Sequence, residues 1–252
     1  MGGGFHNISR ISLFLLIGLA TLCGQNYKHW INQIKESSGA NLHHQPQKVK
    51  EVSFPFQSQA HKCEKKDVEN DLLKSQRGED KKLLSFFNGL CNGTYIEMAA
   101  LDGKRFINSF SFNTAFDWKG ILIELVPASY ERLVQNRKNE IALVHSAVCE
   151  ERQTLHYVEQ GATSGIFEFA PPAFKDKWWK DVDISSSRVK EIECAPMKDI
   201  LAKYLDTVNY FDFFSLDVEG AELQVLKMIT TKWLLVSFLW KQMSMIQKRM
   251  RL

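Results

Sequence analysis

The chain has 252 residues, of which 44% are hydrophobic and 24% are charged, an ordinary composition for a globular protein. The formal net charge is +3, and no basic stripe interleaved with aromatic residues runs along the chain, so we expect no nucleic-acid partner. This length allows one medium-sized domain with additional segments.

An apolar run at residues 11–23 follows Arg10. A basic flank before ~7–15 apolar residues is typical of a secretory signal, and the run is shorter than the ~20 residues of a membrane-spanning helix. We expect residues 1–24 to be a signal peptide or a signal-anchor, with the anchor preferred and a buried N-terminal helix as the alternative. The segment would place the protein in the secretory pathway, either in the ER or Golgi lumen as a single-pass type II membrane protein or secreted.

Four cysteines lie outside that run, and their spacing matches no C-x-x-C metal pattern, so no metal site is expected. In an oxidising compartment they can form two disulfides, for which three pairings are possible. We expect Cys63–Cys91 and Cys149–Cys194, and the alternative is four separate buried thiols. Asn92-Gly-Thr94 is a glycosylation acceptor if the domain is lumenal, which would make the chain a glycoprotein.

Residues 25–66 are polar and predict a stem or linker. From residue 67 to 228, short apolar runs alternate with helical segments, a pattern of βαβ units. The sequence therefore predicts an α/β domain with a mainly parallel sheet and helices on both faces. We expect strands at 95–100, 120–126, 141–148 and 211–217, a short edge strand at 154–159, helices at 67–87, 105–116, 127–137, 196–205 and 221–228, and an irregular segment at 161–187.

Acidic and small residues stand where ligands bind in parallel sheets, at the carboxyl ends of the strands. The first strand leads through Glu97 and Ala99 to Asp102 and Gly103, a turn that lets the backbone approach a ligand closely. The second strand ends at Glu124, whose carboxylate can accept both hydroxyls of a ribose. Glu97 has an alternative interpretation as a strand-end acid bonded to nearby backbone. Together the two acids favour an adenosine ligand.

The last strand ends in Asp217, followed by Glu219 and Glu222. We expect Asp217 near the reacting end of the ligand. Glu222 is better explained by its favourable charge at a helix N-terminus.

Four segments together resemble the FkbM-type methyltransferases. They are Tyr95–Gly103, Trp118–Glu124, His145–Val148 and Phe213–Glu222, the last of which carries the string Asp-Val-Glu-Gly-Ala-Glu. The likeness covers residues 83–228. It implies a Rossmann-like class I methyltransferase fold, S-adenosylmethionine as cofactor, and methyl transfer to a hydroxyl oxygen on a sugar-like or other small acceptor.

The resemblance also implies roles for individual residues. Glu97 and Gly103 would line the methionine part of the cofactor and Glu124 its ribose, while Ser146 to Val148, with Ala147 at the centre, would flank the adenine. Asp217 would face the transfer centre and orient the acceptor or act as its base. The family usually has Gly where this chain has Ala99, and the added methyl is expected to weaken cofactor binding.

Residues 229–252 do not fit the pattern, because the fold expects a further buried strand and then an antiparallel pair. We expect an aberrant tail, from a shifted reading frame or altered splicing near Ile229, and C-terminal strands missing from the sheet. A basic membrane-binding helix is the competing explanation.

Two functions from different classes follow. The first is an S-adenosylmethionine-dependent O-methyltransferase, and the alternative is a non-enzymatic trafficking or interaction protein built on the same fold. Phe174, Trp178 and Trp179 could stack on a sugar acceptor, but such residues more often pack a lid.

Overall fold

A computed structural model describes residues 13–15, 50–53, 61–63, 67–204, 207–208, 211–219, 221–222 and 224–225. The predicted tail at 229–252 lies outside these residues, as does most of the N-terminal segment.

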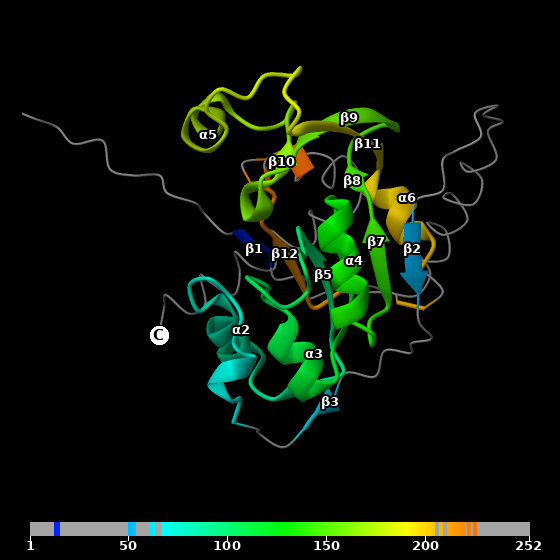
Figure 1. Ribbon diagram of the computed structural model, residues 1–252. Coiled ribbons are helices and arrows are strands. Elements are labelled where there is room, and N and C mark those ends of the chain that lie inside the picture. Colours follow the sequence, from blue (N-terminus) through cyan, green and yellow to red (C-terminus); the bar gives the residue numbers. More distant parts are fainter. Residues whose placement is uncertain are drawn as a thin grey trace, which may run out of the picture.

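Four parallel strands form the centre of a six-stranded sheet with the order β1-β12-β5-β6-β7-β2 (Figure 1). The chain passes from β5 outward through β6 to β7 and then returns to β12 on the other side of β5. This order is that of the first four strands of a doubly wound sheet, and it places the switch point between β5 and β12. The four strands are β5 (Thr94–Met98), β6 (Lys119–Glu124), β7 (Ala142–His145) and β12 (Phe213–Leu216).

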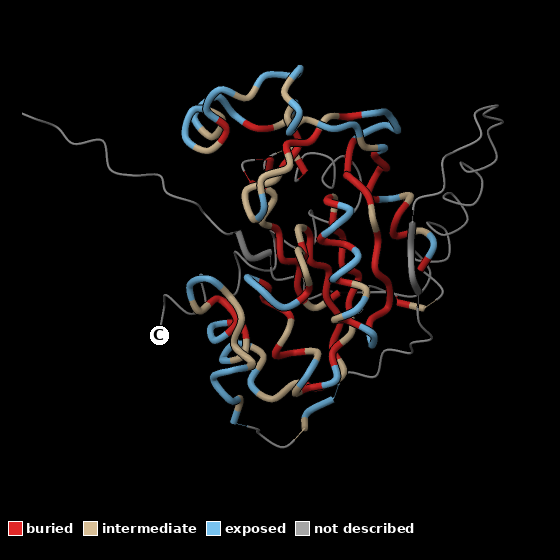
Figure 2. Tube along the Cα trace, in the orientation of Figure 1, coloured by how far each residue is buried: buried red, intermediate tan, exposed pale blue. Residues whose placement is uncertain are grey.

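Alternate residues of each central strand face opposite sides of the sheet, as the period of a β-strand requires. Tyr95, Leu122, Leu143 and Phe213 belong to one core with helices α2, α3 and α4. Residues next to them in the strands belong to a second core with helix α6. Figure 2 shows buried residues along the central strands and exposed ones along the outer side of α4. The predicted parallel sheet with helices on both faces is therefore confirmed.

The helices lie close to their predicted positions, but several differ from the predictions in length. Helix α4 begins at a proline as expected, since a proline fits the first helical turn. The predicted helix at 105–116 begins only at Phe110, because a turn occupies residues 99–109. The predicted helix at 67–87 divides into two. The helices are η1 (Asn70–Leu72), α2 (Glu79–Phe87), α3 (Phe110–Phe116), α4 (Pro127–Asn136), η2 (Gly161–Thr163), α5 (Pro172–Trp178) and α6 (Met197–Ala202).

A second sheet lies beyond the carboxyl ends of the parallel strands, at the top of Figure 1. Its order is β10-β9-β11-β8, and its strands are β8 (Ala147–Val148), β9 (Gln153–Val158), β10 (Gly165–Ile166) and β11 (Val189–Ala195).

The predicted single strand at 141–148 breaks at Ser146, where the chain leaves the first sheet for the second. The prediction of an edge strand at 154–159 was wrong, because β9 pairs on both sides. The segment 161–187 also contains α5 and β10 rather than being wholly irregular.

Three short strands come from the segments predicted to be a leader and a stem. Strand β1 (Leu13–Leu15) pairs antiparallel with β12, and β2 (Lys50–Ser53) pairs antiparallel with β7. Strand β3 (His61–Lys62) pairs with β4 (Leu90–Cys91). Residues 50–53 and 61–62 are thus parts of the fold rather than of a linker. In the described part of the chain, no helix is long and apolar enough to span a membrane.

Two disulfides join Cys63 to Cys91 and Cys149 to Cys194, which confirms the expected pairing. The first ties the residue after β3 to β4, its partner in the two-stranded sheet. The second joins the residue after β8 to β11, so it links two neighbouring strands of the second sheet.

We expect the double substitution Cys149→Ser, Cys194→Ser to lower the free energy of unfolding by about 2–5 kcal/mol, because the bond restrains the unfolded chain. Urea unfolding of the wild-type and variant proteins measures the difference. Peptide mapping without reduction checks the pairing, and a peptide that joins Cys63 to Cys149 or Cys194 would contradict it.

Candidate functional site

Two adjoining cavities open at the carboxyl ends of β5, β6 and β12, beside the switch point of the sheet. Both are small and partly open to solvent. Ala99 and Leu125 line both, so the cavities share one wall. We call them the apolar cavity and the polar cavity.

The apolar cavity lies between the ends of β5 and β6, the β7–β8 break and the start of the helix after β12. Ser146 supplies the one hydroxyl among its lining side chains. Such a space suits a flat, mainly apolar group with a few polar edges, such as a purine. Its lining residues are Met98, Ala99, Ile123, Leu125, Ser146, Ala147, Val148, Ile166, Phe169, Val218, Ala221 and Val225.

The polar cavity is lined by three carboxylates, an amide and a hydroxyl besides its apolar residues. These groups can accept hydrogen bonds from hydroxyl and ammonium groups. Its lining residues are Gln76, Ala99, Leu101, Phe106, Glu124, Leu125, Gly161, Ala162, Ser164, Asp217 and Glu219.

Glu124 is buried at the end of β6, where its carboxylate holds the turns on both sides. Its oxygens accept the backbone N–H groups of Leu101 and Val126, each at an N···O distance of 2.8 Å. Burial raises its pKa to about 7, against the lowering effect of these amide donors. A carboxylate has about four acceptor positions, so with these two amides bound Glu124 keeps acceptor capacity for a ligand, as the sequence interpretation assumes.

Glu97 does not line either cavity described above, although it lies on β5 as predicted. Its carboxylate accepts the backbone N–H groups of Asn108 at 2.8 Å and Ser109 at 3.1 Å, and the Ser215 hydroxyl at 3.1 Å. Burial raises its pKa, whereas these donors lower it. The geometry thus matches the alternative interpretation, in which this acid binds nearby backbone and fixes the turn before α3.

The turn after β5 holds its shape through Asp102 and Gly103. The Asp102 carboxylate accepts the backbone N–H groups of Lys104 at 2.9 Å and Arg105 at 2.8 Å. Gly103 has φ +77°, and a Cβ there would come within 2.6 Å of Arg137 Cγ. Neither residue is among those that line the two described cavities, so both shape the turn rather than its cavity surface.

Ala99 adopts the left-handed backbone region, with φ +60°. This conformation favours glycine, because the Cβ of an L-residue crowds the following carbonyl. The backbone at Ala99 thus prefers glycine, the residue that the resemblance implies for this position. Since Ala99 lines both cavities, its methyl group also occupies their shared wall.

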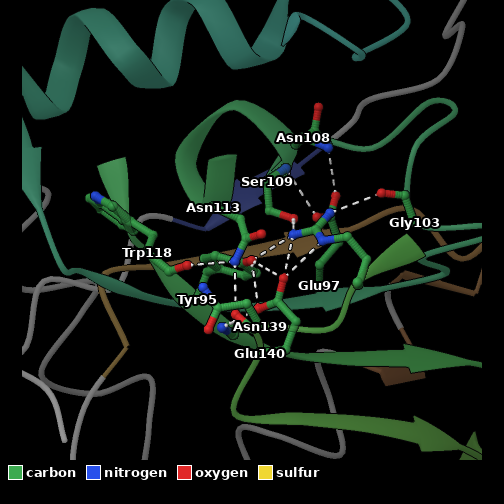
Figure 3. A network of polar contacts seen from close by, with 11 residues as sticks. Tyr95, Glu97, Gly103, Asn108, Ser109, Asn113, Trp118, Asn139 and Glu140 are labelled. Atoms are coloured by element: carbon green, nitrogen blue, oxygen red, sulfur yellow. Dashed lines mark hydrogen bonds and ion pairs between the residues drawn. The ribbon is translucent and has the colours of Figure 1, made fainter. Parts of the chain in front are cut away.

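A buried network behind this turn centres on Arg137, which follows α4. Figure 3 labels its partners Tyr95, Gly103, Ser109 and Glu140. The Arg137 guanidinium donates to the Gly103 carbonyl at 3.0 Å and to the Ser109 hydroxyl at 3.1 Å. It also pairs with Glu140 at 2.6 Å, and the Tyr95 hydroxyl donates to the same carboxylate at 2.8 Å. Burial raises the pKa of Tyr95 well above its usual value, so the phenol keeps the proton that it donates.

Sequence analysis missed this network. The one available signal was a charged pair, Arg137 and Glu140, directly before a buried strand. Both are 1% exposed, and a fully buried charged residue is rare unless it is paired.

The structure brings Ala99, Glu124, Ala147 and Asp217 to the two cavities. Ala147 lines the apolar cavity and Asp217 the polar one, on either side of the shared wall. Sequence analysis missed Gln76, Phe106 and Ser164, which come from turns with no periodic pattern. Among the described residues, no cluster of side chains could hold a metal ion.

The aromatic residues 174, 178 and 179 lie in and next to α5. Trp179 is 1% exposed, donates its indole N–H to the Thr163 carbonyl at 2.9 Å and contacts the ring of Phe174 edge-on. The Trp179 ring thus packs between α5 and the turn at 161–164, as the alternative interpretation held. This contact fixes the turn beside the polar cavity.

A comparison with protein families matches residues 95–246 to the methyltransferase FkbM domain. The chain belongs to this family. The match covers more than half of the chain and includes every residue proposed for the site except Gln76. No curated protein and no solved structure matches it.

We expect Arg137→Met to lower the free energy of unfolding by about 3–5 kcal/mol, because it leaves the Glu140 carboxylate buried without its partner. Arg152→Ala is the matched control, since the Arg152–Asp199 pair is exposed and should contribute under about 1 kcal/mol. Urea unfolding measures both. Equal effects of the two substitutions would contradict the account.

We expect Ala99→Gly to raise the free energy of unfolding by about 0.5–1 kcal/mol, because relief of the left-handed strain exceeds the entropy cost of glycine. Ala115→Gly, in helix α3, should lower it by about 1 kcal/mol. The opposite signs can be read from the same urea unfolding series. A loss of stability in both variants would show that Ala99 is unstrained.

Proposed function

We propose that this FkbM-family protein is an S-adenosylmethionine-dependent O-methyltransferase with a Rossmann-like class I fold, acting on a hydroxyl of a sugar-like or other small acceptor. The observation that carries the proposal is the pair of adjoining cavities at the switch point, one apolar and one acidic, separated by Ala99 and Leu125. S-adenosylmethionine is divided in the same way, because a mainly apolar purine is joined to a charged, hydroxyl-bearing part.

The residues fit such a cofactor in a definite order. Ala147 and Ser146 would border the adenine, and the remaining acceptor capacity of Glu124 would take a ribose hydroxyl. The methionine end would then lie in the polar cavity, where the carboxylates of Asp217 and Glu219 favour its ammonium and sulfonium charges. When bound, the cofactor would supply an activated methyl group.

Asp217 is proposed to orient the acceptor hydroxyl or to accept its proton. It follows β12 directly, so a rigid strand positions it. Glu97, Asp102 and Gly103 are proposed to act on the cofactor indirectly, by holding the turn that carries Ala99 and Leu101. This reassigns their predicted direct contacts to support of the backbone.

The setting proposed for this activity is the secretory pathway, in the ER or Golgi lumen, anchored by the N-terminal segment, or outside the cell. The two disulfides support an oxidising compartment. Asn92 is half-buried in the turn before β5 and is proposed as the glycosylated residue.

Calorimetric titration with S-adenosylmethionine tests the function. We expect wild-type protein to bind it and Glu124→Ala to bind at least tenfold more weakly, because the ribose loses its acceptor and Leu101 and Val126 lose their anchor. Glu131→Ala, on the exposed side of α4, is the matched control and should bind as the wild type does.

Circular dichroism should verify that each variant is folded. Unchanged affinity in folded Glu124→Ala would refute the ribose assignment alone. No detectable binding by folded wild-type protein would refute the enzymatic proposal and favour the non-enzymatic alternative.

A further inference from the structure

A solvent-exposed aromatic ring stands at the rim of the polar cavity. Phe106 is 41% exposed and lines that cavity. Phe86 and Ile184 are the other large hydrophobic side chains exposed in the described part of the chain, and neither lines the two described cavities. Exposure of a large apolar ring is unfavourable in water, so its position beside a cavity suggests a ligand contact.

The backbone holds this ring outward. Phe106 has φ +61°, a region that bulky residues rarely adopt. Its neighbours are fixed: Ile107 is 2% exposed, the Asn108 N–H bonds to Glu97, and the Leu101 N–H bonds to Glu124. The exposure therefore belongs to a turn that is anchored before and after the ring, rather than to a loosely held loop.

Several polar side chains line the cavity together with Phe106 and can form hydrogen bonds to a ligand. They are the Gln76 amide, the Ser164 hydroxyl and the carboxylates of Asp217 and Glu219. The guanidinium of Arg105 lies over one face of the ring, 5.2 Å from its centre, so a ligand would stack on the opposite face. An aromatic face beside such groups suits a molecule with one apolar face and a hydroxylated edge. A wholly apolar acceptor would place apolar surface against charged carboxylates, which is unfavourable.

We propose that Phe106 is a stacking surface for the acceptor and that the acceptor presents a pyranose ring, whose C–H face lies on the phenyl group while its hydroxyls reach the polar side chains. This inference rests on the proposed methyltransferase function. It replaces the aromatic residues near α5 as the acceptor contact, since Trp179 is packed inside the lid.

The test uses the full chain saturated with S-adenosylhomocysteine and a set of probes: the methyl glycosides of glucose, galactose and mannose. Saturation-transfer NMR measures their binding at millimolar concentration, and calorimetry measures the affinity for S-adenosylhomocysteine separately. We compare wild type with Phe106→Ala, Phe106→Tyr and the control Phe86→Ala, which removes another exposed phenyl group, from α2.

At least one glycoside should bind to the wild type, and its dissociation constant should rise about tenfold in Phe106→Ala, a change that corresponds to ~1.4 kcal/mol. Phe106→Tyr and Phe86→Ala should leave it unchanged, and all four proteins should bind S-adenosylhomocysteine with equal affinity.

Binding of S-adenosylhomocysteine without binding of any glycoside would overturn this inference and leave the proposed function standing. A weaker affinity of Phe106→Ala for S-adenosylhomocysteine would also overturn it, because the ring would then contact the cofactor. Failure of the wild type to bind S-adenosylhomocysteine would refute the proposed function itself, and this inference with it.

Discussion

The guanidinium of Arg137 is fully buried where four parts of the chain meet: the start of β5, the turn after β5, the first residues of α3 and the end of α4. It is bonded to Tyr95, Gly103, Ser109 and Glu140. A buried charge is tolerable only when its hydrogen bonds are satisfied together. The four parts can therefore shift only if several of these bonds break, so the network fixes the turn that forms one wall of both cavities.

Two further acids extend this constraint to the cavities themselves. Glu97 fixes the turn from the side of α3, and Glu124 fixes it from the side of β6. The proposed cofactor contact at Glu124 is consequently made by a residue whose position is already determined by its backbone bonds. Such preorganisation reduces the cost of ordering the site when a ligand binds.

The sequence was sufficient to predict the central layers, because near-continuous apolar strands separated by amphipathic helices have few other arrangements. It also placed Glu124, Ala147 and Asp217 at one edge, since the carboxyl ends of parallel strands meet there. The roles of Glu97, Asp102 and Gly103 could not be read in the same way. A carboxylate that binds backbone amides and one that binds a ligand occupy the same place in a motif, and only the partners distinguish them.

The second sheet was harder to predict from the sequence. Strands β8, β10 and β11 are short or exposed on one side, so they lack the apolar runs that identify a buried strand. Arg137 and Phe106 were missed because their burial and exposure are opposite to what their residue types normally show. Phe106 lines the candidate site and Arg137 holds the turn beside it, where such exceptions are expected.

A crystal structure of the protein with S-adenosylhomocysteine tests the central claim most directly, namely that the two adjoining cavities form one cofactor site. The account predicts adenine in the apolar cavity beside Ala147, a ribose hydroxyl within hydrogen-bond distance of Glu124, and the amino acid end in the polar cavity. S-adenosylhomocysteine bound elsewhere, or bound in this cleft with no contact to Glu124, would contradict it.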